Sequence, residues 1–361
     1  MAMVTRKISL QLLTASLLVA TIYACSSRTA TTDTISNASA PVSTSTPDST
    51  ATPSNSGQLS RPVVISAQDF DLPIVGDGKS SLPTTVISAD DVKVKITDSS
   101  RIIVLNEAIA EIVISLGFGD KIIGRDATTT LAALAAIPKV SSGHDISAES
   151  VLELKPTLVI GDTRSGPPEA IQQLRGAGVP IVLAPEVWKL SDIAPRITLI
   201  AKALGAETFG TNLLDATQSD IDKALNTLDS STTKPRVAFI YVRGTASVFL
   251  LGGKESGADE MIRSAGGIDV GTDLDLAAFT PLTSEAIVNA NPAIIVVTTR
   301  GLASVGGIDG LLELPGVAQT PAATSRAVVS IDDDLLFSFG PRTGELIVRL
   351  AQAFKILTTE N

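Results

Sequence analysis

The side chains that most often bind metals or act as nucleophiles are scarce in this chain of 361 residues. It contains one histidine, His144, one cysteine, Cys25, one tryptophan and two tyrosines. A zinc site needs three or four ligands drawn mostly from Cys and His, so this inventory argues against a zinc or copper site made of protein ligands alone. A disulfide needs two cysteines and is excluded within the chain. A serine hydrolase would need His144 as its general base, so that hypothesis depends on this single histidine.

Two glycine-rich segments are similar to catalytic motifs but lack a required residue. Residues 76–80 end like a phosphate-binding loop, yet Pro73 stands where the first glycine of that loop belongs. Ser304 lies between glycines, but Leu302 stands where a nucleophile elbow needs a glycine. We therefore expect a protein that is not an enzyme.

The charge balance is acidic. The chain has 28 Lys and Arg residues against 38 Asp and Glu residues, which gives a formal net charge of −10. Affinity for nucleic acids comes largely from basic side chains that displace counterions from phosphates. We therefore expect no nucleic-acid partner.

The single cysteine stands at the end of a secretory signal. Residues 1–24 begin with Arg6 and Lys7, continue as an apolar stretch, and end with the small Ala24 before Cys25. This pattern predicts a signal peptide that is cleaved before Cys25, with lipid then attached to that cysteine. Residues 25–60 are dominated by Ser and Thr without an apolar period, which predicts a disordered tether between the anchor and the folded part.

From Arg101 onward, apolar strand patterns alternate with helix patterns. Strands are expected at 101–105, 121–124, 158–160 and 181–183, and helices at 107–116, 147–154 and 168–174, with Asn106 as a helix cap. Such alternation predicts an α/β fold, in which helices cover both faces of a mainly parallel sheet. A short hairpin is expected between residues 82 and 97.

An internal repeat indicates that one unit is used twice. The pattern from Glu149 to Arg164 recurs from Glu285 to Arg300. In both copies a helix is followed by a proline that ends it, then by an apolar strand and the pair Thr-Arg. Helical patterns without strand signals fill residues 190–228 between the two copies. We therefore expect two Rossmann-like lobes joined by a long helix, with a ligand cleft between them. The expected boundaries are 61–205 for the amino-terminal lobe, 206–232 for the linking helix and 233–361 for the carboxyl-terminal lobe.

The scarce side chains fall at positions that suit such a cleft. In open α/β sheets, ligands bind beyond the carboxyl ends of the strands. Tyr241 ends the predicted strand 237–242, and His144 lies in a loop before a helix of the first lobe. Arg243, two residues after Tyr241, should point to the same side of an extended segment. These positions place one candidate ligand in each lobe.

Four segments carry a resemblance to a known family: Ser142–Asp145, Gly166–Glu169, Tyr241–Gly244 and Thr299–Gly307. With two lobes, a helical backbone and a lipid anchor, the chain resembles the substrate-binding lipoproteins of bacterial ABC importers. Within that group it resembles the actinobacterial haem-binding lipoproteins. The resemblance covers about Arg101 to Leu357, which is nearly the whole folded part of the chain.

The resemblance implies that the transported ligand is haem, as ferric protoporphyrin IX, held by two axial ligands. His144 of the Gly-His-Asp segment and Tyr241 of the Tyr-x-Arg-Gly segment fill the two ligand positions of the family. Imidazole and phenolate both bind haem iron. We expect Arg243 to hold the phenolate by hydrogen bond and charge, and Asp145 to orient His144.

The resemblance also implies partners and a location. The protein would sit on the extracellular face of the cytoplasmic membrane through its lipid anchor, receive haem from upstream surface proteins and deliver it to the ABC permease. Glu149 and Glu260 are the expected permease-docking acids. Arg164 and Arg300 are candidates for the haem propionates, and Thr298 stands where some relatives have a methionine near the haem.

Two alternatives remain open. An iron-siderophore or cobalamin carrier of the same class would bind its ligand without either axial side chain. A lipid-anchored esterase-like enzyme would depend on His144. Titration with hemin separates the haem hypothesis from both.

Overall fold

Two main sheets organise the computed structural model, which describes residues 62–143, 145–228 and 234–359. The sheet of the amino-terminal lobe is entirely parallel, in the order β5-β4-β8-β9. Its strands are β4 (Ile102–Val104), β5 (Ile122–Arg125), β8 (Leu158–Asp162) and β9 (Ile181–Ala184). Each strand begins with an apolar run, as expected for parallel strands that are covered on both faces. The predicted α/β class is confirmed.

The sheet of the carboxyl-terminal lobe has seven strands in the order β1-β15-β14-β10-β11-β13, with β12 paired to β10. Its strands are β1 (Val63–Ile65), β10 (Arg236–Arg243), β11 (Val248–Gly252), β12 (Ile268–Asp269), β13 (Phe279–Pro281), β14 (Ile294–Thr298) and β15 (Val328–Ile331). The pairs β1-β15, β15-β14, β14-β10 and β10-β12 are parallel, whereas β10-β11 and β11-β13 are antiparallel. The sequence did not indicate this antiparallel edge.

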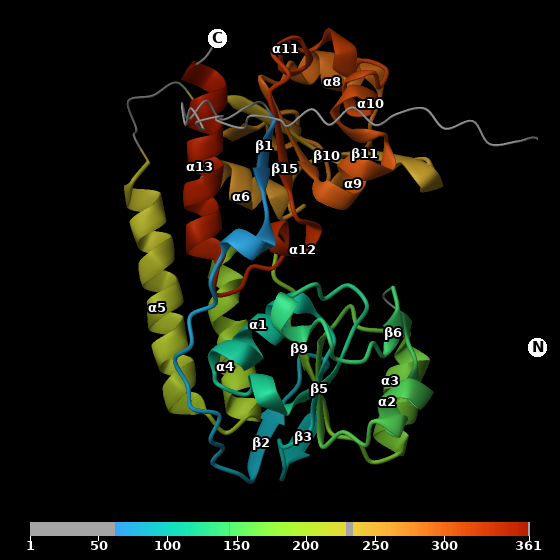
Figure 1. Cartoon of the computed structure of the whole chain (residues 1–361), viewed down its shortest axis with the longest axis vertical. Coiled ribbons are helices and arrows are strands. Elements are labelled where there is room, and N and C mark those ends of the chain that lie inside the picture. The colour runs from blue at the N-terminus through green and yellow to red at the C-terminus, as the bar shows by residue number, and fades with distance from the viewer. Residues whose placement is uncertain (1–61, 144, 229–233, 360–361) are drawn as a thin grey trace, which may run out of the picture. The chain divides into compact units, whose positions relative to one another are not determined.

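Short helices accompany both sheets (Figure 1). Those of the amino-terminal lobe are α1 (Glu107–Ser115), α2 (Ala148–Glu153) and α3 (Pro168–Gly176). Those of the carboxyl-terminal lobe are α6 (Ala258–Ser264), α7 (Val270–Asp273), α8 (Ser284–Ala290), α9 (Thr299–Ser304), α10 (Gly307–Leu312), α11 (Pro321–Thr324) and α12 (Asp333–Leu336). The repeat is confirmed as α2-β8 in one lobe and α8-β14 in the other. Asn106 caps α1 as predicted, because its side chain accepts from the amide of Ala108 at 2.8 Å.

Two small hairpins complete the amino-terminal lobe. The expected hairpin between residues 82 and 97 is β2 (Thr84–Ile87) with β3 (Lys93–Ile96). A second one, β6 (Ser141–Ser142) with β7 (Asp145–Ile146), was not expected, since two residues per strand are too short for any alternation to appear in the sequence.

The first described strand does not follow the lobe boundary expected at residue 61. β1 pairs with β15 and thus belongs to the carboxyl-terminal sheet. Asp332, just after β15, holds the chain that follows β1, because its Oδ2 accepts from the amide of Ala67 at 2.7 Å and from the hydroxyl of Ser66 at 3.1 Å. An apolar run of three residues fits either sheet, so its local pattern does not specify its partner strand.

Three long helices form a backbone along both lobes: α4 (Ile193–Ala203), α5 (Glu207–Asn226) and α13 (Thr343–Thr359). Figure 1 shows α5 beside α13, running from the level of the amino-terminal lobe toward the carboxyl-terminal lobe. One cluster of buried apolar side chains extends from Val104 through Ile197, Ile221 and Leu350 to Phe239 of β10. The two lobes therefore share a hydrophobic core, and burial of this core resists their separation.

Buried charges add to the junction between the lobes. Arg342, just before α13, donates to Glu111 at 2.5 Å and to Glu107 at 3.3 Å, and both acids lie on α1. All three side chains are almost fully buried. Burial raises the pKa of Glu111 to about 7, although the charge of Arg342 acts in the opposite direction. The arginine of one lobe thus neutralises acids of the other.

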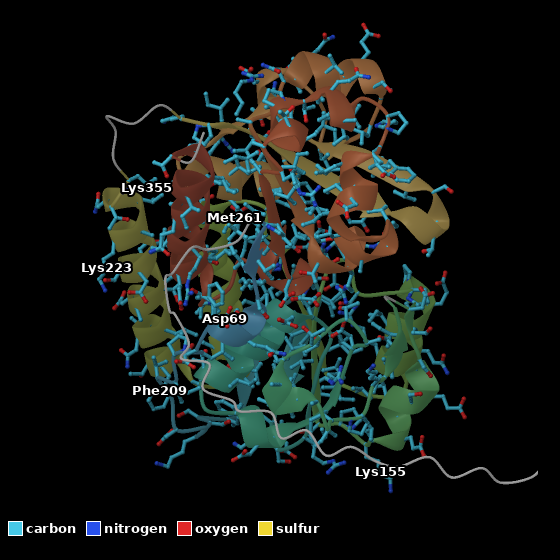
Figure 2. The ribbon with its side chains drawn as sticks, turned by 45° about the horizontal axis from the view of Figure 1, so that its top comes forward. Asp69, Lys155, Phe209, Lys223, Met261 and Lys355 are labelled. Atoms are coloured by element: carbon cyan, nitrogen blue, oxygen red, sulfur yellow. The ribbon has the colours of Figure 1, made fainter. Side chains whose placement is uncertain are left out.

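Exposed charged side chains cover the outer surface, for example Lys155, Lys223 and Lys355 (Figure 2). Within the described part of the chain, no helix combines the length and the apolar character needed to cross a membrane.

We predict that Arg342→Ala lowers the free energy of unfolding by about 3–5 kcal/mol, because it leaves two buried carboxyl groups without their cation. Urea denaturation followed by circular dichroism measures this change. Arg349→Ala is the matched control, since Arg349 lies on α13 and pairs with Glu345 at the surface. It should cost less than about 1 kcal/mol. Equal losses in the two variants would contradict the prediction.

Candidate ligand-binding cleft

Tyr241 and Arg243 lie at the end of β10, an interior strand of the carboxyl-terminal sheet. Successive side chains of a strand point to opposite faces. Ile240 and Val242 are therefore buried on one face, while Tyr241 and Arg243 are half-buried on the other. The expectation that the two side chains share a side is met.

The Tyr241 ring is fixed by two neighbours. The ring of Phe279, on β13, lies edge-on to it, with ring centroids 5.9 Å apart. The Arg243 guanidinium lies over the ring face, with its Cζ 4.5 Å from the ring centroid. We expected Arg243 to bond to the phenolic oxygen. Instead, its Nη1 donates to the Val242 carbonyl at 2.9 Å and its Nη2 to Asp333 at 2.7 Å.

These side chains line a cavity of about 440 Å³. This volume lies in the range of small-molecule and cofactor sites, about 300–1,000 Å³. Its wall comes from both lobes and is made by Asn106, Glu107, Ala108, Thr128, Arg164, Trp188, Tyr241, Arg243, Leu250, Phe279, Arg300, Asp333, Asp334, Phe337 and Ser338. The cavity is thus the cleft that the sequence predicted between the lobes.

Trp188 lines the cavity from the segment after β9. The Arg164 guanidinium lies over the Trp188 ring, 5.0 Å from its centroid. The indole Nε1 of Trp188 donates to Glu186 at 3.0 Å. A Cβ built on Gly257 of the other lobe would lie 3.1 Å from the Trp188 ring, so Trp188 lies where the two lobes meet.

Arg164 and Arg300, the equivalent arginines of the repeat, both line the cavity. Each is about half exposed and held by an acid of its own lobe: Arg164 by Asp162 at 3.1 Å, and Arg300 by Asp334 at 3.2 Å. The repeat therefore places one partly exposed cation on each side of the cleft.

A second cavity of about 330 Å³ adjoins the first and shares three wall residues, Asn106, Thr128 and Arg164. Ile146 of the β6-β7 hairpin lines it. His144, the expected histidine ligand, lies outside the described residues, as does Cys25; the paired strands β6 and β7 flank position 144.

The other predicted residues have varied surroundings. Thr298 is fully buried and caps α9 by accepting from the amide of Gly301 at 3.3 Å, and it is not part of the cavity wall. Glu149 is exposed in the first turn of α2. Glu260 is half-buried, accepting from the amide of Leu190 at 3.3 Å and from Arg263 at 2.9 Å. The docking role of the two glutamates stays a prediction.

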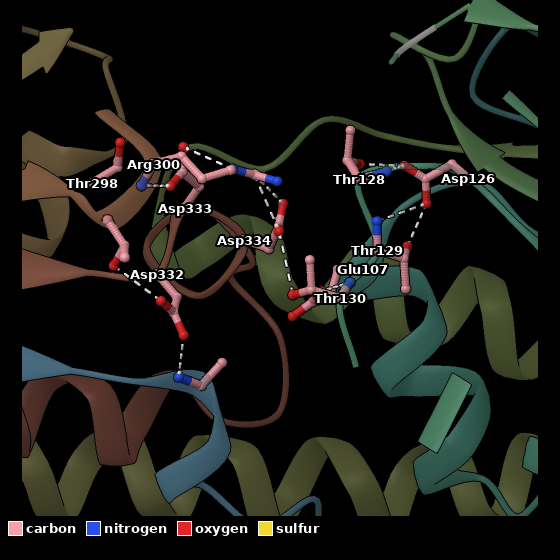
Figure 3. A network of polar contacts seen from close by, with 12 residues as sticks. Glu107, Asp126, Thr128, Thr129, Thr130, Thr298, Arg300, Asp332, Asp333 and Asp334 are labelled. Carbon is pink, nitrogen blue, oxygen red and sulfur yellow. Dashed lines mark hydrogen bonds and ion pairs between the residues drawn. The ribbon is translucent and has the colours of Figure 1, made fainter. Parts of the chain in front are cut away.

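Polar groups of the two lobes meet beside the cavity (Figure 3). The Thr130 hydroxyl of the amino-terminal lobe lies 3.0 Å from Glu107 and 3.5 Å from Asp334 of the opposite lobe. Burial and the negative charge of Glu107 raise the pKa of Asp334 to about 7, and the charge of Arg300 only partly offsets them. Asp334 therefore changes charge near neutral pH.

Sequence reasoning missed several wall residues, among them Trp188, Phe279, Phe337, Asp333 and Asp334. Two signals were present in the sequence: Trp188 is the only tryptophan, and three aspartates follow directly after an apolar strand. Across the described residues, no group of three or more His, Cys, Asp and Glu side chains is arranged to hold a metal ion.

Comparison with known proteins identifies the group to which this architecture belongs. A family model described as "Periplasmic binding protein" matches residues 102–335. The chain belongs to the periplasmic binding protein family. Members of this family are extracytoplasmic substrate-binding proteins of ABC importers, not enzymes.

Several individual proteins are similar to this chain in structure or in sequence. The haem-binding protein HmuT has a similar solved structure, with a TM-score of 0.75 and 34% identity over 81% of this chain and 97% of that one. The structure of the periplasmic haem-binding protein RhuT from Roseiflexus sp. RS-1 has a TM-score of 0.68 and 37% identity, over 72% of this chain and 100% of that one. The ABC transporter substrate-binding lipoprotein YvrC of Bacillus subtilis is 28% identical over 75% of this chain and 85% of its own length. The predicted resemblance to haem-binding lipoproteins is confirmed.

Two further comparisons bear on the ligand. Solved HmuT variants replace by alanine a tyrosine and an arginine two positions apart, the same separation as between Tyr241 and Arg243, and another replaces a histidine. A cobalamin-binding protein of Halobacterium salinarum is 23% identical over 77% of this chain and 76% of its own length.

The raised pKa of Asp334 predicts a pH dependence of stability. Its value is about 7 in the folded protein against 3.8 in the absence of its surroundings, so the folded state retains a proton that the unfolded state has lost. The contribution of Asp334 to the free energy of unfolding should therefore fall as pH rises from about 4 to about 7. Asp334→Asn should remove about 2–4 kcal/mol of that fall, as measured by urea denaturation at each pH. Glu111 contributes in the same direction, so part of the slope should remain.

The control for this measurement is Asp309→Asn, which changes an exposed aspartate paired with Arg326. It should leave the pH slope as in the wild type. A slope that Asp334→Asn does not reduce would contradict the assignment.

Proposed function

We propose that this protein binds haem in the cleft between its lobes and delivers it to an ABC importer. The observation that carries the proposal is the Tyr241 phenol, which borders a cavity with aromatic walls and partly exposed arginines on both sides. The 34% identity to HmuT over 81% of this chain supports the same ligand.

The wall of the cavity fits the chemistry of haem. A porphyrin is a flat apolar disc, and the rings of Trp188, Phe279 and Phe337 offer apolar surfaces to it. Its two propionates need cations at the edge, and Arg164 and Arg300 supply them from opposite sides of the cleft. The porphyrin nitrogens already provide four ligands, so the protein needs only axial ones.

The proposed axial ligands are Tyr241 and His144. Phenolate is a hard anion and favours ferric over ferrous iron, which suits a carrier that must avoid redox chemistry. Tyr241 is at the cavity, whereas the role of His144 rests on its sequence motif alone. Asp145, next to it, would orient the imidazole.

The remaining parts of the proposal concern delivery. A lipid such as palmitate on Cys25 would hold the protein on the outer face of the cytoplasmic membrane, with residues 25–60 as a tether. Glu149 and Glu260 would dock on the permease, and upstream surface proteins would supply the haem. Substitution of either glutamate should slow haem uptake by cells without changing hemin binding in solution.

We predict that Tyr241→Phe abolishes phenolate ligation while it preserves the ring under Arg243. Wild-type protein titrated with hemin should show a Soret band and a ferric phenolate charge-transfer band, and the variant should lose the latter. Hemin should dissociate from the variant at least about tenfold faster, which corresponds to a lost ligand bond worth about 1.4 kcal/mol. Transfer to apomyoglobin measures this rate.

The control is Phe209→Leu, which removes an aromatic ring on α5 that is not part of the cavity wall. It should leave both absorption bands unchanged. Wild-type protein without a Soret band would refute haem binding. Tight binding of cyanocobalamin in its place would support the second candidate, which the cobalamin-binding relative favours.

The single tryptophan gives an independent measurement. Trp188 lines the cavity, and haem quenches nearby tryptophan fluorescence by energy transfer. Stoichiometric hemin should therefore quench most of the emission. Unchanged emission on binding would place hemin outside this cavity.

A further inference from the structure

We infer that Asp333 is a positioning residue that holds Arg243 over the Tyr241 ring. This inference rests on the proposed function, in which Tyr241 is the iron ligand. The Arg243 Nη2 donates to Asp333 Oδ1 at 2.7 Å, the shortest of the hydrogen bonds to the Arg243 guanidinium. Figure 3 shows Asp333 next to Arg300 as well.

Asp333 is itself fixed by the chain around it. It begins α12, and its Oδ2 accepts from the backbone amide of Arg300 at 3.0 Å, in the first turn of α9. The Arg300 Nε lies 3.4 Å from its Oδ1. Its side chain is only 7% exposed, against 31% for that of Arg243. Both oxygens of this buried carboxylate are therefore engaged from separate elements, which makes it a rigid acceptor.

Arg243 depends on that acceptor. Its other hydrogen bonds go to the carbonyl of Val242, the neighbouring residue, and, at a long 3.4 Å, to the Thr298 hydroxyl. An arginine side chain has about 2 kcal/mol of rotamer entropy to lose, and charge-assisted bonds to carboxylates are the ones that best offset this cost. Without the carboxylate, the guanidinium would sample positions away from the ring.

The position of this guanidinium matters for the ligand bond. The guanidinium lies over the face of the Tyr241 ring, so it helps to hold the phenol in one orientation at the cavity. The Asp333 carboxylate also accepts from the Arg300 backbone amide, so Asp333 is held between β10 and α9. Through these contacts, Asp333 would act on the Tyr241–iron bond without touching the haem.

The first test needs no haem. In wild-type apoprotein at low temperature, NMR should show guanidinium proton signals of Arg243 that are resolved from those of solvated arginines, and Arg243→Lys assigns them by removing them. Asp333→Asn should merge these signals with the solvated ones, because a neutral amide binds the guanidinium more weakly. Resolved signals that persist in Asp333→Asn would overturn the inference whether or not the protein binds haem.

The second test uses the hemin complex. Asp333→Asn should weaken the phenolate charge-transfer band and speed hemin dissociation by about 10- to 100-fold, as changes behind a metal ligand do. Arg243→Ala should do the same, and the double variant should be no worse than either single one, because both act through one contact. Additive effects would mean that Asp333 acts independently of Arg243.

Asp332→Asn is the matched control. Asp332 is the preceding aspartate, and its carboxylate accepts from Ser66, Ala67 and Thr299 instead of from a cleft arginine. It should leave the charge-transfer band and the Arg243 signals unchanged even if it lowers stability. If it changes them as much as Asp333→Asn does, Asp333 has no specific positioning role. A wild type that does not bind hemin would instead refute the proposed function, and the NMR test would still decide the inference.

Discussion

The fixed junction between the lobes is the constraint on which the cleft depends. A single apolar core extends through α4, α5 and α13 into both sheets, and Arg342 of one lobe neutralises Glu107 and Glu111 of the other. A buried arginine with two buried acids is costly to separate, because separation leaves charges in an apolar interior. This junction sets the spacing between Trp188 on one side of the cavity and Tyr241 on the other. A rigid ligand such as a porphyrin suits a cleft of set width, since little conformational entropy is lost on binding.

The three consecutive aspartates after β15 show how adjacent residues acquire different roles. Asp332 ties the chain after β1 to the end of the carboxyl-terminal sheet, Asp333 joins Arg243 and Arg300, and Asp334 faces Glu107 of the other lobe. A run of acids in a sequence is usually a solvated surface. Here all three lie at the carboxyl end of a parallel strand, where ligand-binding groups gather in α/β folds.

The surroundings of Arg243 refine the chemistry expected from the sequence. Spacing alone placed Arg243 on the same side of β10 as Tyr241, and the structure agrees. Its guanidinium lies over the ring face and not at the phenolic oxygen, because Asp333 and the Val242 carbonyl take its donors. It therefore contacts the phenol through the ring face, and its guanidinium is held there by a carboxylate that no sequence motif marked.

The sequence by itself determined the α/β class, the helix cap at Asn106, the repeat that places Arg164 and Arg300 in equivalent positions, and the common face of Tyr241 and Arg243. Each of these follows from the order of residues over one or two elements, where backbone periodicity and capping act locally. The tertiary structure alone decided that β1 joins the carboxyl-terminal sheet. It also decided that Phe279 packs on Tyr241 and that Trp188 packs on Arg164. Finally, it paired Arg342 with acids of the opposite lobe. These contacts join residues more than a hundred positions apart or on different elements. Their partners are chosen by burial and by the neutralisation of charge in a shared interior. Apolar periodicity shows which residues are buried but not which partners they meet.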